Sequence, residues 1–463
     1  MRLLDELNSR LRADEDAAVA ALAEAQRELR AAAAMQPRPD EWIPLASVPV
    51  LLDREEVELL GEASRELTAA VRSDPAVALY GDIDTALEEL RTPAPLRPFV
   101  RAEIPHEVEL SRSDFLLGSD GWQANEINIC AGLGGLLVED YDACFSRRPL
   151  RDLLAAGGCR ARTPMDLLAR AVHRRCEKLA GGDGRPVLAV VDWEGYDVAY
   201  LRDHVRMAEL FAARGFETVV CHHRELRYEH GRLRLRGRPV DVVHREFLLE
   251  DMPQDPDSAR PVLDAAVDGA VVLTTGFRAE WQAQKVTFGL LHQAARRGLL
   301  SPAAAELVRR RIPETWLLTP EALADGEAAF GAHTDLVLKP SIGSLSQGVR
   351  LGADMDEGEF RSALRAAAEN LDAPHVLQRL IPPGTVPFPH LNDARDALSF
   401  PATQVSIGFF VVDGEPAGAW SKVCPRSVPT IIHHHNGGQW GSVRYPDGPR
   451  AAGRTGQDGG RRW

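Results

Sequence analysis

Residues 185–226 place an apolar strand, an amphipathic helix and a second apolar strand in direct succession. The first strand is RPVLAVVDWEG, the helix is VAYLRDHVRMAELFAARGF, and the second strand is ETVVCHHREL. Two strands joined through a helix in this way form a right-handed unit with a parallel sheet. We therefore expect a Rossmann-like domain over residues 156–275. The fingerprint G-x-G-x-x-G is absent from it, so a dinucleotide is not implied.

The chain of 463 residues is too long for one ordinary hydrophobic core, so several domains are expected. Residues 1–155 contain helices, one of which starts near Asp53, and a β-hairpin. Residues 276–445 contain two strands around a Gly/Ser loop and a long second hairpin. Residues 446–463 are rich in Gly and Arg without periodicity, and we predict a disordered tail. The expected fold class is mixed α/β.

Composition excludes several classes of protein. The formal net charge of −14 argues against a nucleic-acid binder, which usually carries a basic excess. Apolar runs are too short for a membrane span, and the charged N-terminal helix is not a signal peptide. The six cysteines have no C-x-x-C spacing, which favours a reducing cytoplasm. They are Cys130, Cys144, Cys159, Cys176, Cys221 and Cys424.

The stretch RSDFLLGSDGWQANEIN, residues 112–128, reads as two strands around a turn. Centred on Asp120, it predicts three facing pairs on one side of the ladder: Arg112 with Asn128, Asp114 with Glu126, and Leu116 with Ala124. Two opposed carboxylates repel each other. A divalent cation would convert this repulsion into coordination, since Mg²⁺ takes one or two carboxylates plus substrate phosphates. The alternative is a solvated hairpin face with an Arg–Asp ion pair.

Lysine is scarce in this chain. Of 54 basic residues only four are lysines, namely Lys178, Lys285, Lys339 and Lys422. Where Lys persists among so many Arg residues, a compact ammonium with rotatable donors is favoured. In VLKPSIGSLSQGV, Lys339 ends an apolar strand before a Gly/Ser loop, which suits a nucleotide polyphosphate. The order differs from that of a Walker A loop, and a plain hairpin with a Gly-rich turn is the alternative.

Together these motifs resemble a known family. The pattern R-x-D-x(11)-E-x-N, followed by Lys285 in a helix and by LVLKP with a glycine loop, resembles the circularly permuted ATP-grasp ligases, most closely the glutathionylspermidine synthetase-type group. In ordinary ATP-grasp enzymes the metal-binding strand follows the nucleotide-binding lysines, whereas here it precedes them. The resemblance covers about residues 40–445. It implies a circularly permuted ATP-grasp fold with a Rossmann-like, pre-ATP-grasp domain.

The resemblance also implies roles for individual residues. Asp114, Glu126 and Asn128 resemble the Mg²⁺ ligands, and Arg112 resembles the catalytic arginine near the transferred phosphate. Residues implied in ATP binding are Lys285 and Lys339 at the phosphates and adenine, Gly343, Ser344, Ser346 and Gly348 in the lid loop, and Gln378 in the hinge whose backbone reads the adenine edge. Two features depart from the family. The loop GSLSQG carries no charge, and AGAWSKVCPRS offers Lys422 or Arg426 where an arginine is usual.

Three further motifs admit a plainer interpretation. Cys130 has no histidine beside it in the sequence, so we interpret it as a structural cysteine rather than a nucleophile. The run His433–His434–His435 suggests a metal site, but consecutive residues of a strand do not face one point, and a polar loop is favoured. The basic stretch CHHRELRYEHGRLRLRGR indicates a solvated face or a patch for an anionic substrate.

The function implied by the resemblance is an ATP-dependent carboxylate–amine ligase that forms an amide bond through an acyl phosphate. Its cofactors would be ATP and Mg²⁺. Its partners would be a small-molecule carboxylate and an amine, drawn from amino acids, peptides or polyamines, without nucleic acid or membrane; a homodimer is left open. Two alternatives are a phosphotransferase on the same fold and a catalytically inactive nucleotide-binding homologue.

Overall fold

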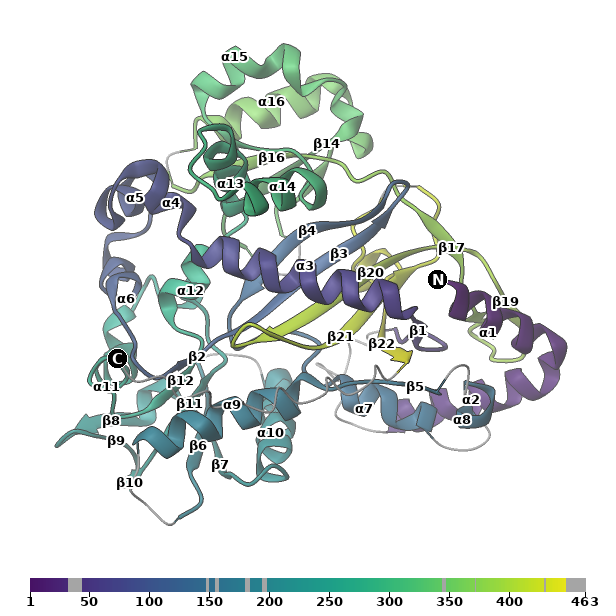
Figure 1. Cartoon of the computed structure of the whole chain (residues 1–463), viewed down its shortest axis with the longest axis horizontal. Coiled ribbons are helices and arrows are strands. Elements are labelled where there is room, and N and C mark those ends of the chain that lie inside the picture. Colours follow the sequence, from purple (N-terminus) through teal and green to yellow (C-terminus); the bar gives the residue numbers. More distant parts are fainter. Residues whose placement is uncertain are drawn as a thin grey trace, which may run out of the picture.

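The computed structural model describes residues 1–31, 44–146, 150–154, 158–179, 184–193, 198–343, 347–370, 372–428 and 430–446. Three larger sheets organise these residues, and the largest lies at the centre (Figure 1). The predicted tail from residue 447 onward lies outside the described residues, as do Ser344 and Ser346 of the predicted lid loop. None of the described helices combines the length and apolar character that crossing a membrane requires.

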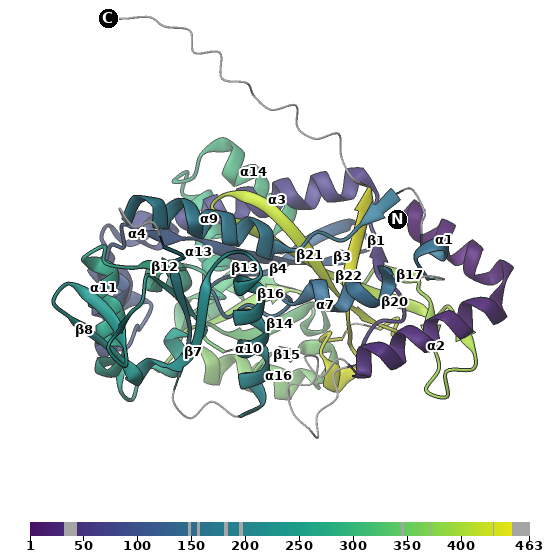
Figure 2. The same cartoon turned by 90° about the horizontal axis from the view of Figure 1, so that it is seen from below.

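The N-terminal segment, expected to be one helix, forms two. α1 (Arg2–Ala13) and α2 (Glu15–Ala31) are separated at Asp14, whose φ of −144° is not helical. Both helices lie at one end of the molecule (Figure 2). The spacing predicts an apolar stripe of Leu4, Leu7, Leu11, Leu22 and Leu29. The first four are buried, and the side chain of Leu29 lies outside the description.

The central sheet joins strands from the first third of the chain to strands from its end. Its path runs β1-β22-β21-β20-β3-β4, with β17 paired to β20 and β5 paired to β22. The strands are β1 (Val50–Leu51), β3 (Leu110–Gly118), β4 (Gly121–Ile129), β5 (Cys159–Arg160), β17 (Thr385–Pro387), β20 (Ala402–Val412), β21 (Glu415–Cys424) and β22 (Gln439–Pro446). The predicted hairpin is thus confirmed as β3–β4, and the long second hairpin as β20–β21.

Helix α3 (Arg54–Arg72) crosses one face of this sheet (Figure 1). It starts where the sequence predicts, because Asp53 and Glu56 form a capping box. Gly61 of α3 packs against the ring of Phe409 on β20, where an added Cβ would lie 3.3 Å from the ring. Since strand side chains alternate, the neighbouring position, Gly408, belongs to the opposite face. That opposite face carries the candidate site.

The parallel sheet of the Rossmann-like domain is confirmed, with strand order β2-β12-β11-β6-β7 and parallel pairing throughout. Its strands are β2 (Glu107–Val108), β6 (Val187–Asp192), β7 (Glu217–His222), β11 (Val242–Arg245) and β12 (Val272–Thr274), and α10 (Val198–Ala212) connects β6 to β7. The edge strand β2 comes from the segment just before the β3–β4 hairpin. The basic stretch forms a small separate sheet, β8 (Leu226–Glu229), β9 (Arg232–Leu235) and β10 (Arg238–Pro239).

A third, antiparallel sheet forms a lid unit, with strand order β13-β16-β14-β15. Its elements are β13 (Thr315–Leu318), α15 (Pro320–Phe330), β14 (Leu336–Pro340), β15 (Arg350–Leu351), α16 (Glu357–Ala368) and β16 (His375–Arg379). Leu338, Phe360 and Leu377 form part of one apolar cluster between the sheet and its helices. Alternation then leaves Val337, Lys339 and Gln378 on the opposite face. The predicted strand–loop–strand around the Gly/Ser loop is confirmed as β14 and β15.

The helix predicted to carry Lys285 is interrupted. α12 (Phe277–Gln282) ends before it, and α13 (Val286–Arg296) begins after it, so Lys285 is an N-cap residue rather than a residue of the helix body. The prediction of one continuous helix is wrong here. The Lys285 backbone N–H donates instead to Ser341 O, 3.1 Å away, which ties this junction to the end of β14.

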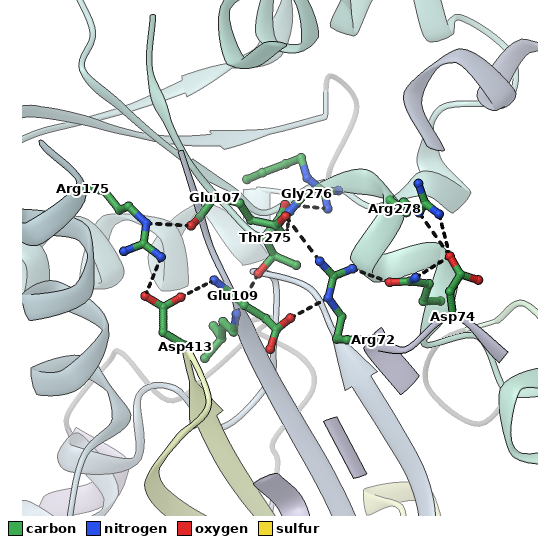
Figure 3. A network of polar contacts seen from close by, with 12 residues as sticks. Arg72, Asp74, Glu107, Glu109, Arg175, Thr275, Gly276, Arg278 and Asp413 are labelled. Atoms are coloured by element: carbon green, nitrogen blue, oxygen red, sulfur yellow. Dashed lines mark hydrogen bonds and ion pairs between the residues drawn. The ribbon is translucent and has the colours of Figure 1, made fainter. Parts of the chain in front are cut away.

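A polar network joins the parallel sheet to the central sheet (Figure 3). Arg72 Nε of α3 is 2.7 Å from Glu109 Oε2, and its Nη2 is 3.7 Å from Glu107 Oε2. Arg175, on α9 (Pro164–Leu179), donates to Glu107 O and lies 3.2 Å from Asp413 Oδ2. Asp413 Oδ1 accepts from Glu109 N at 3.0 Å. The burial of Glu109 raises its pKa to about 7, with Arg72 opposing the shift.

Candidate active site

Strand register assembles the site on one face of the central sheet. Asp114 of β3 pairs with Glu126 of β4 on one side and with Gly408 of β20 on the other. Gly408 pairs in turn with Trp420 of β21. Residues two positions away share this face, which adds Arg112, Asn128 and Lys422 to it. The predicted pairs Asp114–Glu126 and Arg112–Asn128 are confirmed.

The third predicted pair, Leu116 with Ala124, is wrong. The register shifts beyond Asp114, so that Leu116 pairs with Gln123 and Ala124 with Phe115. Asn125 is the extra residue of this β-bulge, which a two-residue turn between Gly118 and Gly121 requires. The bulged residue contacts the site directly, because Asn125 O accepts a hydrogen bond from Lys339 Nζ at 3.1 Å.

Arg112 is fixed on three sides. Its Nε and Nη2 donate to the two oxygens of Asp114 at 2.5 and 2.9 Å, and its Nη1 donates to Gly134 O at 2.7 Å. Its guanidinium carbon lies 5.1 Å from the centre of the Trp420 ring. Lys422 Nζ is 3.7 Å from Asp114 Oδ2 and 5.2 Å from the same ring. Trp420 thus packs against both cations beside Asp114.

Two glycines make room for the Trp420 ring. A Cβ on Gly408 would lie 2.1 Å from Trp420 Nε1, and a Cβ on Gly135 would lie 2.4 Å from Trp420 Cδ2. Gly135 also has a φ of +88°, which other residues rarely adopt. Gly135 thus lets the turn CAGLGG, residues 130–135, approach the Trp420 ring closely.

Three of the four lysines surround Glu126. Lys285 Nζ is 3.2 Å from Glu126 Oε1 and also donates to Gly343 O. Lys339 Nζ donates to Gln378 Oε1 at 2.6 Å. Burial alone would raise the pKa of Glu126, but the charges of Lys285, Lys339 and Lys422 lower it to about 2. Burial lowers the pKa of Lys339 to about 8, with Glu126 opposing the shift.

These side chains line one cavity of about 500 Å³ between the lid sheet and the central sheet. The predicted site residues on its wall are Arg112, Asp114, Glu126, Asn128, Lys285, Lys339, Gly343 and Gln378. Lys422 also lines it, whereas the alternative Arg426 and the loop residue Gly348 do not. Lys178 is exposed on α9, away from this cavity, as expected. Three of the four lysines, Lys285, Lys339 and Lys422, therefore lie on the wall of the same cavity.

The hinge role of Gln378, whose backbone would read the adenine edge, stays a prediction. The residue is in the interior of β16, paired with Thr315 of β13 on one side and Val337 of β14 on the other. Its side chain lines the cavity and accepts from Lys339. The next residues along the chain, Arg379 and Leu380, also line the cavity and follow the paired part of the strand.

Sequence reasoning missed Trp420 and Asn125. Trp420 is two residues from Lys422 on a strand, so their shared face was a signal that could have found it. Asn125 had no such signal, because a bulge is set by the pairing of both strands.

The structure also places Cys130 and part of the histidine run at residues 433–435. Cys130 is buried on the cavity wall, and burial raises the pKa of its thiol, so it stays protonated, in keeping with a structural cysteine. His433 lines the cavity, and the side chain of His434 lies outside the description. Among the described residues, no group of three His, Cys, Asp or Glu could hold a metal ion, which gives the histidine run no support as a metal site.

The donor set fits Mg²⁺ bound together with a polyphosphate. Asp114 and Glu126 offer two carboxylates on one face, and Mg²⁺ completes its shell with water and phosphate oxygens. Asn128 Nδ2 is a buried donor without a hydrogen-bond partner, and an oxygen of the bound phosphate could accept from it. The surrounding lysines are complementary to negatively charged phosphates and would repel a second metal cation.

Comparison with known proteins supports the fold. No protein-family model and no curated protein sequence matches the chain. Among solved structures, a glutathione synthetase-like effector from Globodera pallida in its apo form shares 11% identity over 92% of this chain and 96% of its own, with a TM-score of 0.60. A protein described as a gamma-glutamylcysteine synthetase from Methylobacillus flagellatus shares 11% identity over 78% of this chain and 84% of its own, at 0.38.

A D-alanyl-alanine synthetase A from Vibrio cholerae shares 13% identity over 48% of this chain and 68% of its own, with a TM-score of 0.30. Of these three structures, the first establishes a shared fold at a TM-score above one half. The chain therefore shares the fold of this glutathione synthetase-like effector, which is a mixed α/β architecture.

Proposed function

We propose that this protein is an ATP-dependent ligase that joins a small-molecule carboxylate to an amine through an acyl phosphate. One observation carries the proposal: two facing carboxylates, three lysines and an arginine line a single cavity between two sheets. Such an arrangement suits phosphoryl transfer, in which catalysis is mostly positioning and electrostatic stabilisation.

Asp114, Glu126 and Asn128 would hold Mg²⁺. When bound, the ion neutralises phosphate charge and makes the transferred phosphorus more electrophilic. Lys285, between α12 and α13, and Lys339, on β14, would bind the phosphate oxygens of ATP. Arg112 would bind the oxygens that carry charge during transfer, because two of its five N–H donors remain beyond those given to Asp114 and Gly134.

The chemistry balances without a protein nucleophile. A carboxylate oxygen attacks the γ-phosphorus, the bond to the ADP oxygen breaks, and an acyl phosphate forms. The amine nitrogen then attacks the acyl carbon, the bond to the phosphate oxygen breaks, and the nitrogen proton leaves with the phosphate. Holding both reactants together in one cavity supplies much of the rate. A protonated Cys130 has no part in this scheme.

A screen tests the proposal. Amino acids, short peptides and amines are offered in pairs with Mg·ATP, ADP release is measured, and products are identified by mass. A ligase requires both partners and yields an amide. Hydroxylamine in place of the amine traps the acyl phosphate as a hydroxamate. A stable phosphorylated product without amine dependence would instead identify a phosphotransferase, and binding of ATP without turnover would identify an inactive homologue.

A further inference from the structure

The cavity extends beyond the nucleotide end into the Rossmann-like domain. We call this part the acidic arm and define it by Leu96, Leu248, Leu249, Glu250, Glu280 and Trp281, all on the cavity wall. It begins where Cys130 and Gly132 line the same cavity. Arg112, Cys130 and Glu280 line this one cavity, so the arm is continuous with the proposed reaction centre.

The walls of the arm are fixed by hydrogen bonds and by packing. Leu249 N donates to Glu280 Oε1 at 2.7 Å, which joins η6 (Leu249–Asp251) to α12. Trp281 Nε1 donates to Thr92 Oγ1 at 2.8 Å. Leu96, Leu249 and Trp281 belong to the apolar core of the Rossmann-like domain. A ligand in the arm therefore meets a preformed and largely apolar surface.

The ionisable side chains that define the arm are both carboxylates, Glu250 and Glu280. Glu280 Oε2 lies 2.7 Å from Arg245 Nη2. Because Arg245 is fully buried and paired with Glu280, its guanidinium is not accessible to a ligand in the arm. Glu250 is half-buried, and its side chain makes no ion pair or hydrogen bond with the described residues. None of the described residues that define the arm is Lys, Arg or His. Three cations of the same cavity, Arg112, Lys285 and Lys422, are each paired with Asp114 or Glu126.

This polarity discriminates between ligands. A carboxylate in the arm would face Glu250 without a side-chain cation to pair with, and an unpaired buried charge is costly. An ammonium would gain Glu250 as its partner, while its carbon chain packed on Leu96, Leu249 and Trp281. One unpaired carboxylate matches one ammonium.

We infer that the acidic arm is the binding site of the amine substrate, and that this substrate is an amine on an apolar chain that carries no carboxylate. The ligand can be a substrate only if the proposed ligase function holds. The binding preference of the arm does not depend on turnover. It distinguishes the amine of this protein from an α-amino acid.

The test measures binding by calorimetry to the full chain with Mg²⁺ and a non-hydrolysable ATP analogue. The probes are hexylamine, hexanoate and 6-aminohexanoate. Hexylamine is expected to bind at least about tenfold more tightly than the other two, as a half-buried charge pair allows. Glu250→Gln is expected to remove this preference, and Glu250→Lys to reverse it toward hexanoate. The exposed Glu58→Gln on α3 is the control and should bind like the parent protein.

The possible outcomes test the acidic arm and the ligase function separately. Equal binding of the three probes, no binding of any, or an unchanged preference in Glu250→Gln overturns the inference. A hexylamine preference that depends on Glu250, without ADP release from any substrate pair, supports the arm and removes the ligase function. ADP release with an amino acid as the acceptor, without the preference, removes the arm and keeps the ligase.

Discussion

Lys285 Nζ lies 3.2 Å from Glu126 Oε1, so a cation proposed to bind phosphate is paired with a carboxylate proposed to bind metal. Asp114, on the neighbouring strand β3, is paired in the same way. Lys422 Nζ lies 3.7 Å from its Oδ2 atom. Binding of Mg·ATP would exchange these partners. Phosphate would replace the carboxylates beside the lysines, and the metal would replace the lysines beside the carboxylates.

This exchange predicts strong coupling between metal and nucleotide. Mg²⁺ alone would compete with Lys285 for Glu126, and ATP alone would compete with Glu126 for Lys285, so each helps the other to bind. Removal of Mg²⁺ with a chelator should weaken ATP binding by about five- to 150-fold, a usual range for coupling between sites. Calorimetric titrations of each ligand, with and without the other, measure this factor. Independent binding would contradict the exchange.

Glu126→Gln should affect the two forms of the nucleotide in opposite directions. The variant loses a metal ligand, so turnover should fall by about a hundredfold or more and Mg·ATP should bind more weakly. Loss of the negative charge also frees Lys285, so metal-free ATP should bind more tightly than to the parent protein. Asp114→Asn should likewise abolish turnover. Loss of both affinities together would point to misfolding, which circular dichroism and thermal melting detect.

Lys285→Ala and Lys339→Ala should each raise the KM for ATP by about tenfold to a hundredfold, as expected for a lost charge-assisted hydrogen bond. Lys178→Ala is the matched control, because this lysine is exposed on α9, away from the cavity. It should leave the KM unchanged. Steady-state kinetics with the substrate pair from the screen provide the measurement, and a similar KM in all three variants would refute the roles assigned to these lysines.

Trp420→Leu should lower kcat more than it changes the KM for ATP. The ring packs on Arg112, whose orientation serves phosphoryl transfer, whereas the nucleotide is held mainly by lysines. Trp420→Phe should retain part of the activity, since a phenyl ring also attracts a guanidinium. Trp122→Leu, also buried in the central sheet but not on the cavity wall, is the control. If Trp122→Leu gave the same loss of kcat, the effect would be one of stability.

The polar network of Figure 3 predicts a pH dependence of stability. Folding raises the pKa of Glu109 from 4.5 to about 7, so the folded protein binds the proton more tightly. This contribution to stability is complete below pH 4.5 and is lost as the pH rises through 7. Glu109→Gln lacks it, so the parent protein should lose up to about 3 kcal/mol relative to the variant between these limits. Urea unfolding at pH 4.5 and pH 8 measures the difference.

Strand alternation and turn chemistry were enough to predict which residues of the β3–β4 hairpin face each other at Asp114 and Glu126. They were not enough at Leu116, because the bulge at Asn125 arises from fitting a two-residue turn to the pairing beyond it. Lysine scarcity indicated Lys285, Lys339 and Lys422, since it reflects a chemical requirement at single positions. The place of Trp420 depends on the register of β21 with β20 and of β20 with β3, which local sequence does not specify.

The pairing of β3 with β20 has a consequence for synthesis of the chain. The ribosome completes the β3–β4 hairpin early, but the strand that covers its inner edge spans Ala402–Val412 and emerges near the end of translation. Until then, α3 can shield one face of the hairpin while the edge of β3 stays open to pairing with other nascent chains. A product truncated before Ala402 would therefore be prone to aggregate, and expression trials should retain the chain through β22.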